Sequence, residues 1–214
     1  MTTFRSVPAS PWPSAPSRVA RWLGPGALMV GLAGIVGARW LATTRGLDPL
    51  GTGAAFGLAL LALWLLATRS RLRRPAGRRR ITVVVAAGVA FGLALVGLVL
   101  AGAVIGGSPI APGLSRPAAP FLPWAAITIL VAAAQEGILR GVLFDRLRTA
   151  GGIAAAIAIT TILFALIHVP LYGWHVVPLD LAVGLGLAGL RLSTGTFVAP
   201  AVAHATADLA TWWL

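Results

Sequence analysis

Long apolar stretches, interrupted by short polar segments, occupy most of the chain. Seven of them are apolar enough to be membrane helices; they cover about 22–43, 51–68, 81–105, a region starting near Pro123, 151–168, 176–192 and 196–214. A helix needs roughly 20 apolar residues to cross the hydrocarbon core of a bilayer. The pattern therefore predicts an all-α fold, a polytopic transmembrane helical bundle of about seven spans.

Composition supports a membrane protein. Of the 214 residues, 58% are hydrophobic and 10% are charged, and the mean hydropathy is +0.90. A soluble domain carries roughly 25% charged residues, so a separate soluble domain is not expected. In a soluble chain the net charge of +12 would suggest nucleic acid; here every basic residue is an arginine, mainly between apolar stretches, which is the topology signal of a bilayer protein. The all-arginine, alanine-rich usage favours a bacterial plasma membrane, and the absence of cysteine excludes disulfides and thiolate metal sites.

Polar segments divide the chain into three parts. Residues 1–17 are rich in Pro and Ser and predict a disordered cytoplasmic tail without a signal peptide. Residues 18–119 hold the first three spans, with a basic loop at 69–80 that has seven arginines and no acid. Such a loop stays in the cytoplasm, which predicts an inside N-terminus and, with seven spans, an outside C-terminus. Residues 120–214 carry nearly all the other intramembrane polar groups.

A few polar side chains stand at membrane depth. Glu136, the only glutamate, precedes Arg140 by one helical turn, and His204 precedes Asp208 by the same spacing, while His168 lies on the helix between these pairs. Taken singly, a histidine near a helix end is more often a packing residue, and a Glu–Arg pair is as often structural as functional. Intramembrane charges are costly, and their concurrence on three neighbouring helices favours a functional site.

The remaining charges have simpler interpretations. Asp48 in a turn and Asp145 among arginines are predicted to be surface charges, and Asp180, near the start of its span, is predicted to be interfacial. Arg39 is the one charge within the first three spans.

Three short motifs in this order, QEGILRG, FALIH and GTFVAPAVAHATAD, resemble the CPBP family of intramembrane peptidases. That family includes enzymes that cleave prenylated CAAX proteins and bacterial members linked to bacteriocin processing and self-immunity. Its pattern is EExxxR, then FxxxH, then HxxxN or HxxxD. The resemblance covers Gln135 to Asp208 and implies a catalytic set; its members are Gln135, Glu136, Arg140, His168, His204 and Asp208.

The resemblance also implies possible cofactors and partners. Members are commonly described as metalloproteases, which would place Zn²⁺ or another divalent metal at His168 and His204, although a metal-free, glutamate-based mechanism is also proposed for the family. The implied substrate is a membrane-embedded or lipid-anchored peptide or protein.

Gln135 departs from the family pattern, which has a glutamate there as general base. An amide cannot accept a proton from water. Either Glu136 takes that role, assisted by Asp208, or the site binds without catalysis. The leading prediction is an intramembrane peptidase, the alternative is a non-catalytic binding or immunity factor, and a third is a proton-coupled transporter using Glu136, His168 and Asp180.

These assignments predict a geometry. The polar atoms of Glu136, His168 and His204 should lie within about 8 Å of a common centre. Helix lengths at 1.5 Å per residue suggest a bend at Gly141, with the amphipathic tail 142–148 in the interface. The site would then open to the cytoplasm.

Overall fold

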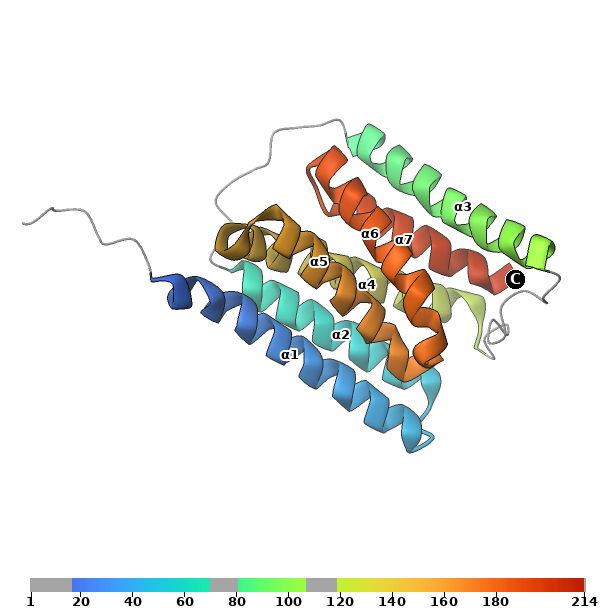
Figure 1. Ribbon diagram of the computed structural model, residues 1–214. Coiled ribbons are helices and arrows are strands. Elements are labelled where there is room, and N and C mark those ends of the chain that lie inside the picture. Colours follow the sequence, from blue (N-terminus) through green and yellow to red (C-terminus); the bar gives the residue numbers. More distant parts are fainter. Residues whose placement is uncertain (1–16, 70–80, 107–118, 214) are drawn as a thin grey trace, which may run out of the picture.

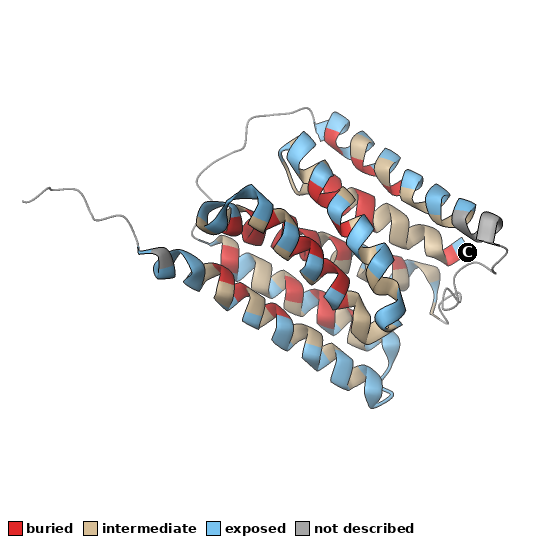
Figure 2. Cartoon of the chain, in the orientation of Figure 1, coloured by how far each residue is buried: buried red, intermediate tan, exposed pale blue. Residues whose placement is uncertain are grey.

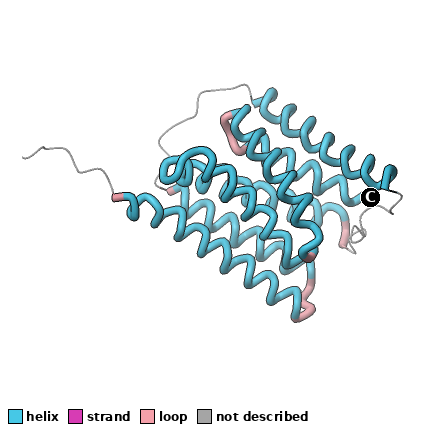
Figure 3. Tube along the Cα trace, in the orientation of Figure 1, coloured by secondary structure: helices cyan, strands magenta, loops and turns pink. Residues whose placement is uncertain are grey.

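The computed structural model describes residues 17–69, 81–106 and 119–213. These residues form helices and no strand, which confirms the all-α prediction (Figures 1 and 3). The elements are α1 (Arg18–Thr44), α2 (Pro49–Thr68), α3 (Ile81–Gly106), α4 (Phe121–Glu136), the π-helix η1 (Gly137–Leu143), α5 (Phe144–Tyr172), η2 (Trp174–Val176), α6 (Val177–Thr194), α7 (Val198–Ala210) and η3 (Thr211–Trp213). Almost all of the predicted tail, the basic loop and most of the proline-rich segment before α4 lie outside the described residues.

Five described helices are long and apolar enough to cross a membrane, so the chain is a multi-pass membrane protein. One of them, Phe121–Tyr172, has 52 residues and contains a non-helical glycine, Gly152, at φ 86°. The chain reverses there, and α4 and the longer part of α5 run antiparallel (Figure 1). With 13 residues, α7 is about 20 Å long, shorter than a hydrocarbon core of roughly 30 Å. The predicted count of about seven spans is therefore not confirmed.

Helix ends follow local sequence signals. Ser17 caps α1 by accepting from the amide of Ala20, and Asp48 caps α2 in the same way before a proline at its first position. Asp48 thus has a structural role beyond that of a surface charge. Gly195, in the left-handed region at φ 73°, ends α6.

Buried residues lie along the centre of the bundle and exposed residues on its outer faces (Figure 2). The exposed residues include many leucines and valines. The apolar side of residues 142–148, which were predicted to lie in the interface, packs on protein. Leu143, Phe144 and Leu147 on this segment are at most 1% exposed and belong to the core. The apolar face of the tail finds protein rather than lipid, and Arg146 ties the tail to α2 by donating to the carbonyl oxygen of Ala67 at 2.9 Å.

Two glycines let α3 approach α7 closely, in line with the packing surface expected of a span rich in small residues. A Cβ at Gly88 would lie 2.7 Å from the carbonyl oxygen of Ala199, and one at Gly92 would lie 2.6 Å from that of Ala203. Both carbonyl oxygens belong to α7, the helix that carries His204, so the close contact between α3 and α7 positions part of the polar cluster.

Replacing Gly92 by alanine is expected to lower the unfolding free energy in detergent by about 1–3 kcal/mol, because the new methyl meets backbone. The matched control is Gly97→Ala on the same helix, where a Cβ meets nothing within 4 Å. Higher helix propensity should leave that variant as stable as the natural protein or more so, by up to about 1 kcal/mol. Equal effects at the two positions in denaturant titrations would argue against the close α3–α7 contact.

Candidate functional site

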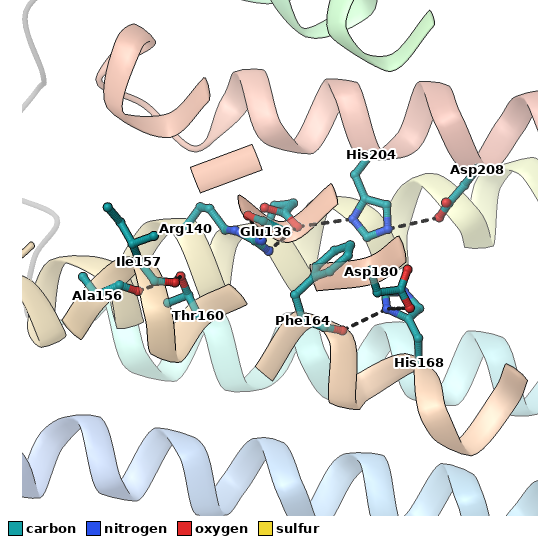
Figure 4. Close-up of polar contacts among 11 residues, drawn as sticks. Glu136, Arg140, Ala156, Ile157, Thr160, Phe164, His168, Asp180, His204 and Asp208 are labelled. Carbon is teal, nitrogen blue, oxygen red and sulfur yellow. Dashed lines mark hydrogen bonds and ion pairs between the residues drawn. The ribbon is translucent and has the colours of Figure 1, made fainter. Parts of the chain in front are cut away.

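A fully buried ion pair occupies the centre of the site, where α4 passes into η1. Nη1 of Arg140 lies 2.9 Å from Oε1 of Glu136, and both side chains are 0% exposed. Nη2 of Arg140 donates to the carbonyl oxygen of Gly184 on α6 at 2.9 Å, and the guanidinium lies 4.7 Å from the ring centroid of Phe164 (Figure 4). The arginine therefore joins α4, α5 and α6 at one point.

The π-helix η1 coincides with the region where a bend was predicted. A π-turn is wider than an α-turn and often occurs at functional sites. A Cβ at Gly137 would lie 2.7 Å from the Trp64 ring, so only glycine admits this indole beside the widened turn. A second helix, α6, contacts η1 through Arg191. Its Nε donates to the carbonyl oxygen of Arg140 at 2.7 Å, and its Nη2 lies 3.0 Å from Oδ1 of Asp145.

His204 lies between two carboxylates. Its Nδ1 is 3.3 Å from Oε1 of Glu136, and its Nε2 is 3.3 Å from Oδ2 of Asp208. Both separations are ion-pair distances, although Nδ1 of His204 has no hydrogen-bond partner. The predicted helical-turn spacing of His204 and Asp208 thus places them in contact and connects α7 to the buried pair.

His168 completes the cluster from α5. Its Nδ1 lies 2.9 Å from the carbonyl oxygen of Phe164, which can only accept, so Nδ1 carries the proton and leaves Nε2 for a ligand. The His168 and His204 rings are 6.0 Å apart, and Figure 4 shows the two histidines close together beside Phe164. With the contact between His204 and Glu136, these distances confirm the predicted convergence of the three residues.

A cavity of about 760 Å³ adjoins this cluster. Four residues of the predicted set line it: Gln135, His168, His204 and Asp208. Glu136 and Arg140 do not line the cavity but are sealed behind it. The two adjacent residues of the QE motif thus differ in access, because one faces the cavity and the other faces Arg140.

The cavity extends away from the arginine-rich end of the bundle. Its lining includes Asp48, Pro120, Tyr172 and Thr211, which lie where α2 and α4 begin and where α5 and α7 end. Arg146, Arg148 and Arg191 lie near the opposite helix ends. The cavity therefore lies at the opposite end of the bundle from the arginine-rich one where the site was predicted to open, and its opening toward the cytoplasm stays a prediction. The tail expected in the interface instead fills the core at that end.

Labelling of single cysteines should report the side of the membrane on which the cavity opens, since the chain has no native cysteine. Leu47→Cys marks the end with the cavity, and Thr149→Cys marks the arginine-rich end; both positions are exposed. If arginines stay inside, a membrane-impermeant maleimide should label Leu47→Cys in intact cells and Thr149→Cys only after permeabilisation. The reverse result would place the mouth of the cavity in the cytoplasm.

His168 and His204 are the residues that would hold the predicted metal. Among the described residues, no group of three or more His, Cys, Asp or Glu side chains is arranged to hold an ion. Nδ1 of His168 is bonded to backbone, so Nε2 is the nitrogen of this ring that would hold a zinc ion, and the ring centroids of His168 and His204 are 6.0 Å apart. The metal at His168 and His204 stays a prediction that elemental analysis of the purified protein can test.

Sequence reasoning left Arg39 out of the site and grouped Asp180 with His168 only in the transporter alternative. Asp180, predicted to be interfacial, has Oδ2 3.5 Å from Nδ1 of His168. Arg39, noted only as an isolated charge, lines the cavity. A lone charge inside an apolar span was the available signal for both, but only the packing of α1 and α6 shows which site they face.

The fold and these contacts define a class: multi-pass helical membrane proteins with a buried carboxylate, guanidinium and imidazole cluster beside a cavity. Residues 117–210 match the model of one family, "Type II CAAX prenyl endopeptidase Rce1-like". The match includes α4 to α7 and all six predicted site residues, and it confirms the resemblance seen in the three motifs. No curated protein and no solved structure matches the chain.

Proposed function

We propose that the protein is an intramembrane peptidase of the CAAX-endopeptidase type, which hydrolyses a peptide bond of a membrane-embedded or lipid-anchored substrate in a bacterial plasma membrane. One observation carries the proposal. Two histidines, a carboxylate and an amide face one cavity within the segment that matches a protease family.

The attacking water in this proposal lies between Gln135 and Asp208. The amide of Gln135 positions the water, and Asp208 accepts its proton, because Asp208 is the half-buried carboxylate on the cavity wall beside the histidines. Glu136 is 0% exposed and does not line the cavity, so it holds His204 rather than the water. His204 gives the proton on Nε2 to the leaving amine as the C–N bond breaks, and Asp208 returns the proton taken from water to Nε2, so both groups end as they began.

His168 acts on the substrate carbonyl. With Nδ1 bonded to the carbonyl oxygen of Phe164, the ring is fixed and presents Nε2 to the substrate. Nε2 takes up a proton from solvent through the cavity and then donates to the negative oxygen of the tetrahedral intermediate. Donors aimed at such an oxygen contribute about 2.7–4 kcal/mol to catalysis. No step in this scheme uses a metal.

Purified protein in lipid vesicles, incubated with a library of membrane-anchored peptides and followed by mass spectrometry, tests the proposal. We expect cleavage by the natural protein and its loss, by at least about a hundredfold, in His168→Asn and His204→Asn. The matched control is His175→Asn, because the third histidine is exposed and does not line the cavity. Cleavage that survives both site variants would contradict the proposal.

One observation favours a non-catalytic binding or immunity factor instead. The residue at the first position of the motif is an amide, and its Nε2 is buried without a hydrogen-bond partner, as in a site that awaits a bound ligand. Peptide binding without cleavage in the same vesicles would decide for this second function. The proton-coupled transporter stays a prediction. Measurement of proton flux across the membrane of those vesicles would test it.

A further inference from the structure

Arg39 is a charged side chain in the cavity that the proposed reaction does not use. It lies on α1, a helix outside the segment that matches the protease family, yet it lines the same cavity as Gln135, His168 and His204. A cation within an apolar helix is energetically costly to bury, and it usually pairs with another group or belongs to a functional site.

The guanidinium of Arg39 points into the bundle rather than toward the membrane surface. Its Cζ lies 4.6 Å from the ring centroid of Phe56, which is 5% exposed. Arg39 is roughly 7.5 Å along the axis from the end of α1, whereas Phe56 is about 10.5 Å from the start of the adjoining α2. An arginine that seeks lipid phosphate would extend the other way, toward the interface.

The guanidinium also lacks a compensating anion. Nε of Arg39 is buried without a hydrogen-bond partner. Within the part of the chain that the structure describes, the arginines with carboxylate partners are Arg140 and Arg191, and Arg39 is in neither ion pair. Arg39 as a whole is half-buried. A partly desolvated cation without an anion is unfavourable, so an anionic ligand that entered the cavity would regain part of this free energy.

We propose that Arg39 binds a carboxylate of the peptide ligand and thereby selects which peptides occupy the cavity. This inference rests on the proposed function for its ligand class, a peptide. A guanidinium fork matches a carboxylate with two parallel hydrogen bonds, and a cavity of about 760 Å³ has room for a short peptide that reaches both Arg39 and the histidines. The carboxylate is either the C-terminus of the peptide or an acidic side chain.

Binding measurements with fluorescent peptides on the full-length protein in detergent distinguish these sources without requiring cleavage. The first pair of peptides differs at the C-terminus, which is a free carboxylate in one and an amide in the other. The second pair differs by Glu or Gln at one position within the peptide. Arg39→Gln should weaken binding of the carboxylate peptide about 10- to 100-fold, the range of a hydrogen bond to a charged group. Arg45→Gln, at an exposed position on the neighbouring turn, is the matched control and should change nothing.

The peptide whose affinity is the same for the natural protein and for Arg39→Gln identifies the carboxylate that Arg39 binds. Arg39→Gln should not weaken further a peptide from which the bound carboxylate has been removed. Equal losses for all peptides, or none, would overturn the proposal, as would an effect that appears only when phosphatidylglycerol replaces phosphatidylcholine in the micelles. Arg39→Lys keeps the charge, so its affinity for the carboxylate peptide should lie between those of the natural protein and Arg39→Gln. Thermal unfolding of each variant distinguishes loss of binding from misfolding. If binding depends on the carboxylate but no peptide is hydrolysed, the proposal for Arg39 is supported and the peptidase function is refuted.

Discussion

Glutamate in place of Gln135 is expected to create peptide hydrolysis or to raise it by about 10- to 1,000-fold, since a well-placed general base contributes roughly 10²–10⁴-fold. The side chain lines the cavity, is 1% exposed and has the length of glutamate, so the substitution adds a proton acceptor without changing shape. The measurement is the cleavage rate on the membrane-anchored peptide library.

Variants of the other two carboxylates provide the controls. In the natural protein, Asp208→Asn should abolish cleavage, whereas in the Gln135→Glu background the loss should be much smaller, because the new glutamate accepts the proton. Glu136→Gln should abolish cleavage in both backgrounds, since it leaves Arg140 buried without its anion and removes the Glu136 contact to His204. Cleavage by the natural protein that survives Glu136→Gln would remove Glu136 from the machinery.

Replacing Arg140 by methionine is expected to destabilise the protein by about 3–5 kcal/mol, the cost of leaving one partner of a buried ion pair uncompensated. Both side chains are 0% exposed, so water cannot take the place of the guanidinium. Loss of the bond to Gly184 and of the packing on Phe164 adds to the effect. Unfolding in detergent, followed by circular dichroism against denaturant, measures it.

The double variant Glu136→Gln with Arg140→Met separates charge from packing. Removing both charges should restore much of the lost stability, because no buried ion is then left unpaired. Arg148→Gln, at an exposed position on α5, should change stability by less than about 0.5 kcal/mol. A double variant as unstable as Arg140→Met would show that shape, rather than charge pairing, dominates at this site.

Side-chain patterns were sufficient to predict the helices and the helix that carries each polar residue. Apolar runs indicated α1, α2 and α3 closely, because lipid-exposed helices need little beyond length and hydropathy. The spacing of four residues between Glu136 and Arg140, and between His204 and Asp208, predicted contacts that the structure contains. Their chemical roles stay predictions.

Backbone geometry and packing were beyond the same reasoning. Hydropathy does not distinguish lipid from protein as the neighbour of an apolar face, so residues 142–148 were placed in the interface although Leu143 and Leu147 are core. That error put the predicted mouth of the cavity at the arginine-rich end of the bundle, whereas its lining lies at the other end. The π-helical turn at Gly137–Leu143 depends on contacts with Trp64 and Arg191, which come from distant helices.

Gly184 supports the site through its backbone, and this has a consequence for genetic experiments. The atom that accepts from Arg140 is its carbonyl oxygen, which every residue type carries, so no side-chain exchange removes it. Alanine scanning at this position would report crowding instead, since a Cβ there lies 3.3 Å from both Phe164 and Thr161. Only a main-chain change isolates the contribution of α6. An ester between Gly184 and Leu185, made by semisynthesis with an α-hydroxy acid, would weaken the acceptor while leaving every side chain as it is.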